Sequence, residues 1–294
     1  MSEGGRNTTI SNERGALRIR DRVFPWGRRT YVMGIVNLSP DSFSGDGAAD
    51  TGAAVARALE QLADGADIID VGAESTRPGY RPIGADTERA RLLPALAALR
   101  AAAPDAPISV DTFKPEVFRA ARAAGADLLN SIWGAPEALV AACAETVTPL
   151  VVMHNKAVAV YERDVMDEVL AFLDEAASRC VRAGIPADHV LLDPGIGFGK
   201  LPEHNITVLR GLDRLVALGY PTLIGTSRKS TIGKLTGRGV GARAFGTAAT
   251  IALAVAAGID VVRVHDVPEQ RDVVRVADAI VRGWRPDGWT ERLP

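Results

Sequence analysis

The sequence ISVDTFKPEVFRAARAAGADLLNSI, residues Ile108–Ile132, contains one complete strand–helix–strand pattern. It begins with the short apolar run Ile108–Val110 and ends with a second one, Leu128–Ile132. Between them lies Pro115–Ala124, an alanine-rich segment with helical spacing, and Gly125 follows where a helix end favours a left-handed residue. The pattern predicts two parallel strands, buried on both faces and joined by a crossover helix.

The same alternation recurs along the chain. Further β-branched apolar runs predict strands at Tyr31–Val36, Ile68–Val71, Leu150–Met153, Val190–Leu192, Thr222–Ile224 and Val261–Val264. Segments with helical spacing lie between them, including Ala53–Leu62, Thr87–Ala101, Met166–Ala183, His204–Leu218, Phe245–Ala257 and Pro268–Arg282. Eight strands in a chain of 294 residues predict an α/β fold, a (β/α)8 TIM barrel. An open doubly wound sheet is the alternative, and the strand count and chain length favour the barrel.

The chain carries no long linker or low-complexity run, so we expect a single domain over residues 16–294. A short N-terminal hairpin is expected around Leu17–Val23, before the barrel begins. Residues 1–15 are polar and lack an apolar signal core, which predicts a disordered lead-in.

Composition limits the partners. A net charge of −2 provides no overall basic field, so we expect no nucleic-acid or membrane partner. The sequence contains no run of about 18 apolar residues, so we expect no membrane span. The only two cysteines, Cys143 and Cys180, lie in expected helices and are predicted to be buried and reduced. We therefore expect a cytoplasmic protein that captures any anionic substrate with a local basic cluster.

Polar side chains follow the expected strands, at the end of a barrel where active sites lie. Acids, amides and a histidine stand at or near the ends of six strands: Asn37, Asp70, Asp111, Asn130, His154 and Asp193. Basic or imidazole groups follow strands two, seven and eight: Arg77, Lys229, Arg263 and His265. The sequence therefore predicts one rim that combines acidic and basic groups.

This combination indicates a definite chemistry. A carboxylate such as Asp193 can accept two parallel N–H bonds from an aminopyrimidinone edge. Guanidinium and ammonium groups can hold a diphosphate. The rim therefore suits a heterocycle that carries a diphosphate leaving group.

Each of these residues also has a simpler explanation. Asp111 and Asp193 could each be only a helix N-cap, which for one residue alone is as good an explanation. The segment Thr226–Ser230 could be a solvated basic loop, and His265 could be a structural histidine. Gly199-Lys200-Leu201 lacks the spacing of a phosphate-binding P-loop. The joint occurrence at six or more strand ends favours a functional site.

Several motifs together resemble those of the dihydropteroate synthase family, and the resemblance extends from about Thr30 to Ile280. They are Met33-Gly-Ile-Val-Asn-Leu-Ser-Pro-Asp-Ser-Phe43, Asp70-Val-Gly-Ala-Glu-Ser-Thr-Arg-Pro-Gly79, Ser109-Val-Asp111, Leu191-Leu-Asp-Pro-Gly-Ile-Gly-Phe-Gly-Lys200, Thr226–Ser230 and Arg263-Val-His-Asp266. Three places differ from the usual family pattern: Ala73, Ser131 and Asn155-Lys156-Ala157.

The resemblance implies roles for individual residues. It implies that the pterin ring is bound by Asp111, Asn130, Asp193, Phe198, Lys229 and Arg263. It places the diphosphate on Asn37, Arg77, Arg263 and His265, with Mg²⁺ near Asn37. It places p-aminobenzoate near Phe43, Thr76, Arg77, Pro78, Ser227 and Ser230. Asp111, Lys229 and Arg263 would be the catalytic groups. The family also implies a homodimer through helices on the outer wall of the barrel, with Phe245–Ala257 as a candidate.

The implied reaction condenses 6-hydroxymethyl-7,8-dihydropterin diphosphate with p-aminobenzoate, and it yields 7,8-dihydropteroate and pyrophosphate. One alternative is a methyltransferase domain that binds methyl-tetrahydrofolate on the same type of barrel. Such a domain has no need for Arg77, the Thr226–Ser230 segment or His265. A second alternative is a pterin-binding paralogue without catalytic activity.

Overall fold

The computed structural model describes residues 14–38, 51–74, 82–286 and 288–289. An antiparallel hairpin comes first, formed by β1 (Ala16–Ile19) and β2 (Arg22–Pro25). The strands that follow are β3 (Tyr31–Asn37), β4 (Ile68–Gly72), β5 (Ile108–Asp111), β6 (Leu128–Ser131), β7 (Leu150–Met153), β8 (Val190–Asp193), β9 (Leu223–Ile224) and β10 (Val261–Val264). The helices are α1 (Thr51–Ala63), α2 (Ala85–Ala102), α3 (Pro115–Ala123), α4 (Glu137–Thr146), α5 (Val165–Arg182), α6 (Pro202–Arg210), α7 (Leu212–Val216), α8 (Ser230–Thr236), α9 (Ala244–Ala257) and α10 (Val267–Val281).

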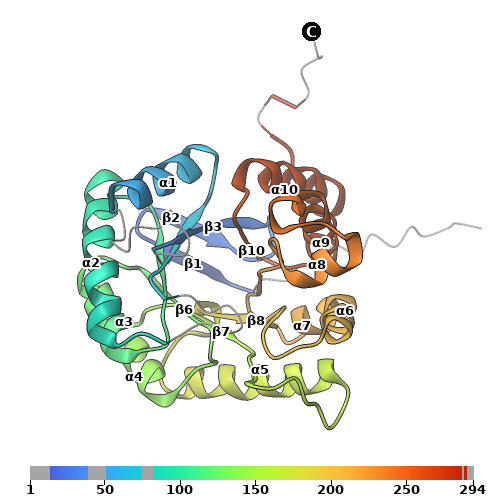
Figure 1. Ribbon diagram of the computed structural model, residues 1–294, viewed down its shortest axis with the longest axis horizontal. Helices are drawn as coiled ribbons and strands as arrows, with labels where there is room; N and C mark the ends of the chain where they lie inside the picture. Colours follow the sequence, from blue (N-terminus) through green and yellow to red (C-terminus); the bar gives the residue numbers. More distant parts are fainter. Residues whose placement is uncertain (1–13, 39–50, 75–81, 287, 290–294) are drawn as a thin grey trace, which may run out of the picture.

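The strands β3–β10 form one parallel sheet that closes on itself. Their order is β8-β7-β6-β5-β4-β3-β10-β9, and a parallel bridge between Leu192 and Thr222 joins the two ends. The helices surround this sheet as an outer ring (Figure 1). The expected (β/α)8 TIM barrel with a short N-terminal hairpin is therefore confirmed.

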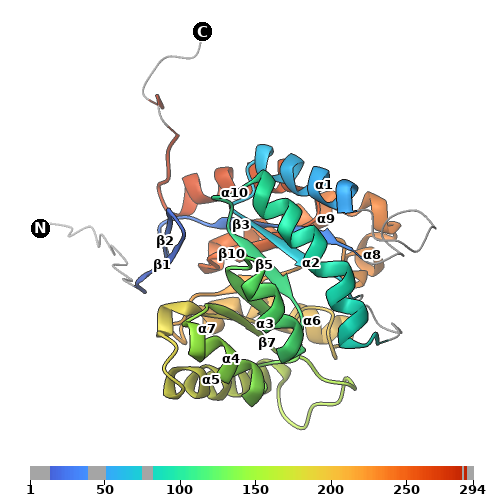
Figure 2. The ribbon, with the colours of Figure 1, turned by 90° about the vertical axis from the view of Figure 1, so that its left-hand side faces the viewer.

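Alternation along the strands divides the core into two layers. On β3, Tyr31 and Met33 belong to the apolar cluster inside the barrel, whereas Val32 and Val36 belong to the cluster under the helices. Buried side chains of the hairpin, such as Leu17, continue the inner cluster. The hairpin lies at the opposite end of the barrel from α8, on the left in Figure 2. It covers the end where the strands begin, which leaves the other end for a site.

The expected helix His204–Leu218 differs from the structure, because two helices, α6 and α7, occupy this segment. They meet at Gly211, where a Cβ atom would lie 2.9 Å from Cγ of Met166. Close packing against α5 therefore sets the break, and the periodicity of one segment does not contain that information. The short helix α8 has no counterpart among the helices expected from the sequence.

Other expectations concern the ends of the chain and its cysteines. The lead-in expected over residues 1–15 falls outside the described residues except for Arg14 and Gly15. Cys143 and Cys180 are buried and free, as expected. Within the described ranges, no helix combines the length and hydropathy needed to cross a membrane.

Candidate active site

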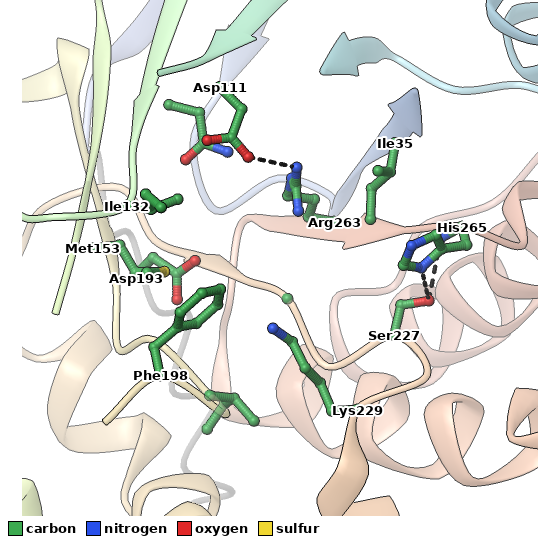
Figure 3. A pocket seen from close by; sticks show the side chains of 13 residues that line it. Ile35, Asp111, Ile132, Met153, Asp193, Phe198, Ser227, Lys229, Arg263 and His265 are labelled. Carbon is green, nitrogen blue, oxygen red and sulfur yellow. Dashed lines mark hydrogen bonds and ion pairs between the residues drawn. The ribbon is translucent and has the colours of Figure 1, made fainter. Parts of the chain in front are cut away.

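A cavity of about 60 Å³ opens at the carboxyl ends of the barrel strands. Its lining comes from β3, β5, β6, β7, β8 and β10 and from the segments after β8 and β9, and Figure 3 shows the residues around it. They are Ile35, Asp111, Asn130, Ile132, Met153, Asp193, Ile196, Phe198, Gly225, Ser227, Lys229, Arg263 and His265.

The floor of the cavity carries acceptors for N–H groups. Asp193 is the last residue of β8 and is only 5% exposed, and its Oδ1 accepts a 2.7 Å hydrogen bond from the backbone N–H of Gly195. Burial raises the pKa of the Asp193 carboxyl, while that N–H and the charge of Lys229 oppose the rise. Asn130 is 3% exposed and lies on β6. A ligand with several N–H donors would satisfy both side chains.

One guanidinium links two carboxylates across the barrel. Arg263 on β10 lies 2.6 Å from Oδ2 of Asp70 and 3.1 Å from Oδ2 of Asp111 (Figure 3 shows the second contact). Asp70 is fully buried and also accepts a 3.0 Å hydrogen bond from the amide of Asn130. Burial lowers the pKa of Arg263, but the attraction of both carboxylates outweighs burial and raises it. Arg263 is therefore a fixed cation.

The pKa of Asp111, the second carboxyl beside Arg263, is shifted by its surroundings. Burial raises its pKa to about 7, with a further rise from Asp70 and an opposing contribution from Arg263. Its carboxylate lines the cavity and is held by Arg263 at 3.1 Å. It is therefore suited to stabilise positive charge that develops beside it.

The opposite wall carries Lys229, Phe198, His265 and Ser227. The ammonium of Lys229 lies 4.1 Å from the centroid of the Phe198 ring, and the two side chains point toward one another in Figure 3. The Nδ1 atom of His265 lies 3.0 Å from Oγ of Ser227. Burial and the charge of Arg263 lower the pKa of His265 to about 3, so the imidazole is neutral near pH 7.

The helix-cap explanation for the two aspartates is wrong. The N-cap of α3 is Lys114 and that of α6 is Leu201, so neither Asp111 nor Asp193 caps the helix that follows it. Asp193 does hold the backbone turn at Gly195, but its side chain still lines the cavity.

Comparison with known proteins places the chain in a family. The family described as "Pterin binding enzyme" matches residues 33–265. The chain belongs to this family. Among the pterin-binding enzymes, it is similar to the dihydropteroate synthase of Clostridium beijerinckii, with 41% identity over 270 residues, which are 90% of this chain and 100% of that protein.

Two solved structures of pterin-binding enzymes share the whole fold. The dihydropteroate synthase of Clostridium difficile in the presence of pteroic acid superimposes with a TM-score of 0.85 and 41% identity, over 88% of this chain and 99% of that one. The dihydropteroate synthase of Xanthomonas albilineans with 4-aminobenzoic acid superimposes with a TM-score of 0.82. Its sequence is 42% identical, and the match covers 88% of this chain and 95% of that one.

Most residues that the sequence assigned to a site of this pterin-binding enzyme come together. Asp111, Asn130, Asp193, Phe198, Ser227, Lys229, Arg263 and His265 all line the cavity. Asn37, at the end of β3, is half-buried, and Ser230 is the exposed first residue of α8; neither belongs to the lining. Phe43, Thr76, Arg77 and Pro78 lie outside the described residues.

One of the places that differ from the family pattern contacts the wall of the cavity. The amide of Asn155 donates a 3.1 Å hydrogen bond to the carbonyl of Ile132, which lines the cavity. Lys156 binds the carbonyl of Val160 and the carboxylate of Glu168, both at 2.8 Å. Ser131 is fully buried. Of these residues, Asn155 contacts the cavity wall through Ile132, whereas Lys156 binds partners outside the lining.

Sequence reasoning missed several residues in or beside the cavity. It placed Asp70 on the rim but assigned it no individual role, although a carboxylate inside an apolar strand is a strong signal of a paired charge. It also left out the apolar lining residues Ile35, Ile132, Met153 and Ile196, which no local pattern separates from other core positions. His154 was expected at the rim, but its ring turns away from the cavity toward Lys200.

Proposed function

We propose that the protein is a dihydropteroate synthase, which joins 6-hydroxymethyl-7,8-dihydropterin diphosphate to p-aminobenzoate and releases pyrophosphate. The observation that carries the proposal is the cavity itself, where Asp111, Asn130 and Asp193 face Lys229 and Arg263. The names of similar proteins and the ligands named with their structures, pteroic acid and 4-aminobenzoic acid, support the same reaction.

The acidic floor would recognise the pterin. Asp193 would accept two N–H bonds from the aminopyrimidinone edge, and Asn130 and Asp111 would bind the remaining polar atoms of the rings. The ring of Phe198 would pack against the heterocycle, with Lys229 next to it. Because these acceptors are buried, a ligand without matching N–H groups would leave them unpaired and bind weakly.

The basic wall would stabilise the leaving group. The bond between the pterin methylene carbon and the diphosphate oxygen breaks, and its electron pair leaves with the diphosphate. Arg263 and His265 would bind this anion, and Asn37 and Arg77 are further proposed contacts. Asp111 would stabilise the cation left on the pterin, and the arylamine nitrogen then attacks the methylene carbon and loses one proton. Asp111, Lys229 and Arg263 are thus the proposed catalytic residues.

The arylamine would enter from the open side of the cavity. Ser227 lines the cavity, and Ser230 is the exposed first residue of α8. The proposed p-aminobenzoate contacts also include Phe43, Thr76, Arg77 and Pro78, which lie outside the described residues.

A magnesium ion fits the donors available. The described part of the chain contains no group of three or more His, Cys, Asp or Glu residues that could hold a metal. Mg²⁺, however, is commonly bound by one or two protein oxygens together with substrate phosphates. The amide oxygen of Asn37 suits this ion, at the end of β3 and next to the strand of Arg263. When bound, Mg²⁺ would neutralise charge on the diphosphate.

Turnover of the purified protein tests the proposal. The protein is incubated with the dihydropterin diphosphate, p-aminobenzoate and Mg²⁺, and dihydropteroate and pyrophosphate are measured. We expect equal amounts of both products. Binding of the pterin without turnover would support a non-catalytic paralogue, and methyl transfer from methyl-tetrahydrofolate would support the methyltransferase alternative.

We further propose that residues 16–294 act as one domain in a cytoplasmic homodimer. Support for the dimer comes from large apolar side chains exposed on the adjacent helices α9 and α10, namely Phe245, Leu253, Val276 and Ile280. Sedimentation of the Leu253→Glu variant tests it, with Val181→Glu on α5 as a control, since Val181 is also exposed. We expect Leu253→Glu to sediment as a monomer and Val181→Glu to remain a dimer. If both variants remained dimers, this interface would be contradicted.

A further inference from the structure

A buried lysine at the end of the glycine-rich segment after β8 has no role in the reaction described above. Lys200 is 9% exposed, and its side chain turns back under the segment that begins at Gly195. Its Nζ lies 2.8 Å from Nδ1 of His154, 3.0 Å from the carbonyl of Gly195 and 3.2 Å from the carbonyl of Phe198. A fourth, longer contact of 3.5 Å runs to the carbonyl of His154, so the three N–H donors of an ammonium are surrounded by possible acceptors.

These partners suit the charged form of Lys200. A neutral amine would match them only if Nδ1 carried the imidazole proton and donated it to the amine lone pair, whereas an ammonium can donate to Nδ1 and to the carbonyls. Burial lowers the pKa of Lys200 to about 7, with the charge of Asp193 opposing the shift. Burying an ammonium is costly, which makes a mere space-filling role a poor explanation for this residue.

The segment that Lys200 holds is also anchored at its other two glycines. The N–H of Gly197 donates to Asn205 at 2.8 Å, and the carbonyl of Gly199 accepts from the Tyr161 hydroxyl at 2.8 Å. Lys200, in contrast, provides the side-chain contacts to the carbonyls of Gly195 and Phe198. Gly195, Gly197 and Gly199 all have positive φ angles of 70°, 83° and 56°, so the turn lacks regular secondary structure. Lys200 joins its two halves, because one acceptor is the carbonyl of Gly195 and another is that of Phe198. The third acceptor, His154, follows β7, and its backbone N–H donates to the carbonyl of Asp193 at 2.9 Å.

Two cavity residues depend on this segment. The backbone N–H of Gly195 orients the carboxylate of Asp193, and Phe198 presents its ring to Lys229. We propose that Lys200 is a positioning residue for the pterin ring: its ammonium ties the carbonyls of Gly195 and Phe198 to His154, and it thereby fixes the carboxylate of Asp193 and the ring of Phe198. This inference rests on the proposed function, since it assumes that a pterin fills the cavity.

The test is the Lys200→Met variant, which keeps the length of the side chain and removes its three donors. We expect the KM for the dihydropterin diphosphate, and the dissociation constant of the pterin measured by calorimetry, to rise at least tenfold. The KM for p-aminobenzoate, measured at saturating pterin substrate, should stay within twofold. A lysine that only stabilised the fold would lower the melting temperature and leave the ratio of the two KM values unchanged.

Lys156→Met is the matched control. Its ammonium also binds a backbone carbonyl and lies on the neighbouring segment after β7, but its partners are Val160 and Glu168. This variant should bind the pterin within twofold of the wild type. An equal loss in both lysine variants would overturn the proposal, because any nearby lysine would then have the same effect.

A pair of substitutions at His154 keeps the inference testable if Lys200→Met does not fold. His154→Asn and His154→Leu both remove the imidazole ring, which packs on Phe172 and Tyr161. Only Asn retains an acceptor close to the position of Nδ1. We expect His154→Leu to weaken pterin binding at least tenfold and His154→Asn to retain most of it. Equal pterin affinity in both folded variants overturns the positioning role. A wild-type protein that neither binds pterin nor turns over would instead refute the proposed function.

Discussion

At the scale of single residues, the proposed selectivity for the pterin depends on Asp193. It is a buried carboxylate at the end of β8, and one of its oxygens is already held by Gly195. In Asp193→Asn the amide keeps one acceptor and turns a donor toward the N–H groups of the ligand. Losing one buried, charge-assisted hydrogen bond costs about 1.5–3 kcal/mol, equivalent to a roughly 10- to 150-fold loss of affinity.

Calorimetric titration of the pterin into Asp193→Asn measures this loss. Asp174→Asn is the control, since Asp174 is an exposed acid on α5. The assignment of Asp193 fails if both variants bind the pterin as tightly as the wild type.

His154 makes stability depend on pH in a defined direction. Burial, together with the charges of Lys200 and Lys156, lowers its pKa to about 3, while an unfolded histidine titrates near 6.5. Between these values the unfolded chain binds a proton that the folded chain does not. The free energy of unfolding therefore falls as the pH drops from about 6.5 to about 3, by up to about 1.4 kcal/mol per pH unit from this group.

Urea unfolding at several pH values checks the effect. The slope of unfolding free energy against pH should be smaller in His154→Asn than in the wild type. The difference should correspond to at most one proton bound on unfolding, or about 1.4 kcal/mol per pH unit. Parallel curves for the two proteins would show that His154 is protonated in the folded state, contrary to its environment.

At the scale of elements, the segment after β8 combines two roles. It leads the chain from β8 to α6, and it brings Asp193 and Phe198 to the cavity. A Cβ atom at Gly195 would lie 1.9 Å from the carbonyl oxygen of His154, and a backbone atom cannot move aside cheaply. Gly195→Ala should therefore destabilise the protein and weaken pterin binding together.

Gly219→Ala provides the matched control. Gly219 also has a positive φ, of 85°, but a Cβ atom there would meet nothing within 4 Å. Its substitution should cost only the left-handed penalty of about 1–2 kcal/mol. Gly195→Ala should cost at least twice as much in urea unfolding. Equal costs would mean that the turn at Gly195 relaxes without strain.

The elements also show what the sequence could and could not predict. The barrel strands are apolar runs with helices between them, so local periodicity was enough to predict all eight. The ends of those strands placed Asp111, Asn130 and Asp193 at one rim, because parallel strands end on the same side. The break at Gly211 and the inward turn of Lys200 depend on neighbours distant in sequence, Met166 and His154, and no local pattern contains them.

At the scale of the whole molecule, the two ends of the barrel have different tasks. The carboxyl end holds the cavity, whereas the hairpin and the starts of the strands close the other end. Asp260 is the polar centre of that closed end and is fully buried. It binds both terminal nitrogens of Arg14, at 2.7 and 2.9 Å, and the backbone N–H groups of Gly27 and Thr222. One carboxylate thus ties the hairpin to the barrel.

The separation of the two ends predicts that stability and catalysis can be changed independently. In Asp260→Asn the guanidinium of Arg14, whose side chain is 6% exposed, loses its counter-charge. Breaking a buried ion pair by removing one partner costs about 3–5 kcal/mol, so the free energy of unfolding in urea should fall by this amount. The KM values for both substrates should stay within twofold, because Asp260 directly precedes β10, at the end of the barrel that the hairpin closes. Asp193→Asn should show the reverse, a large loss of pterin affinity with little loss of stability. If Asp260→Asn raised a KM as strongly as Asp193→Asn does, the closed end of the barrel would have to shape the site, and the two ends could not be independent.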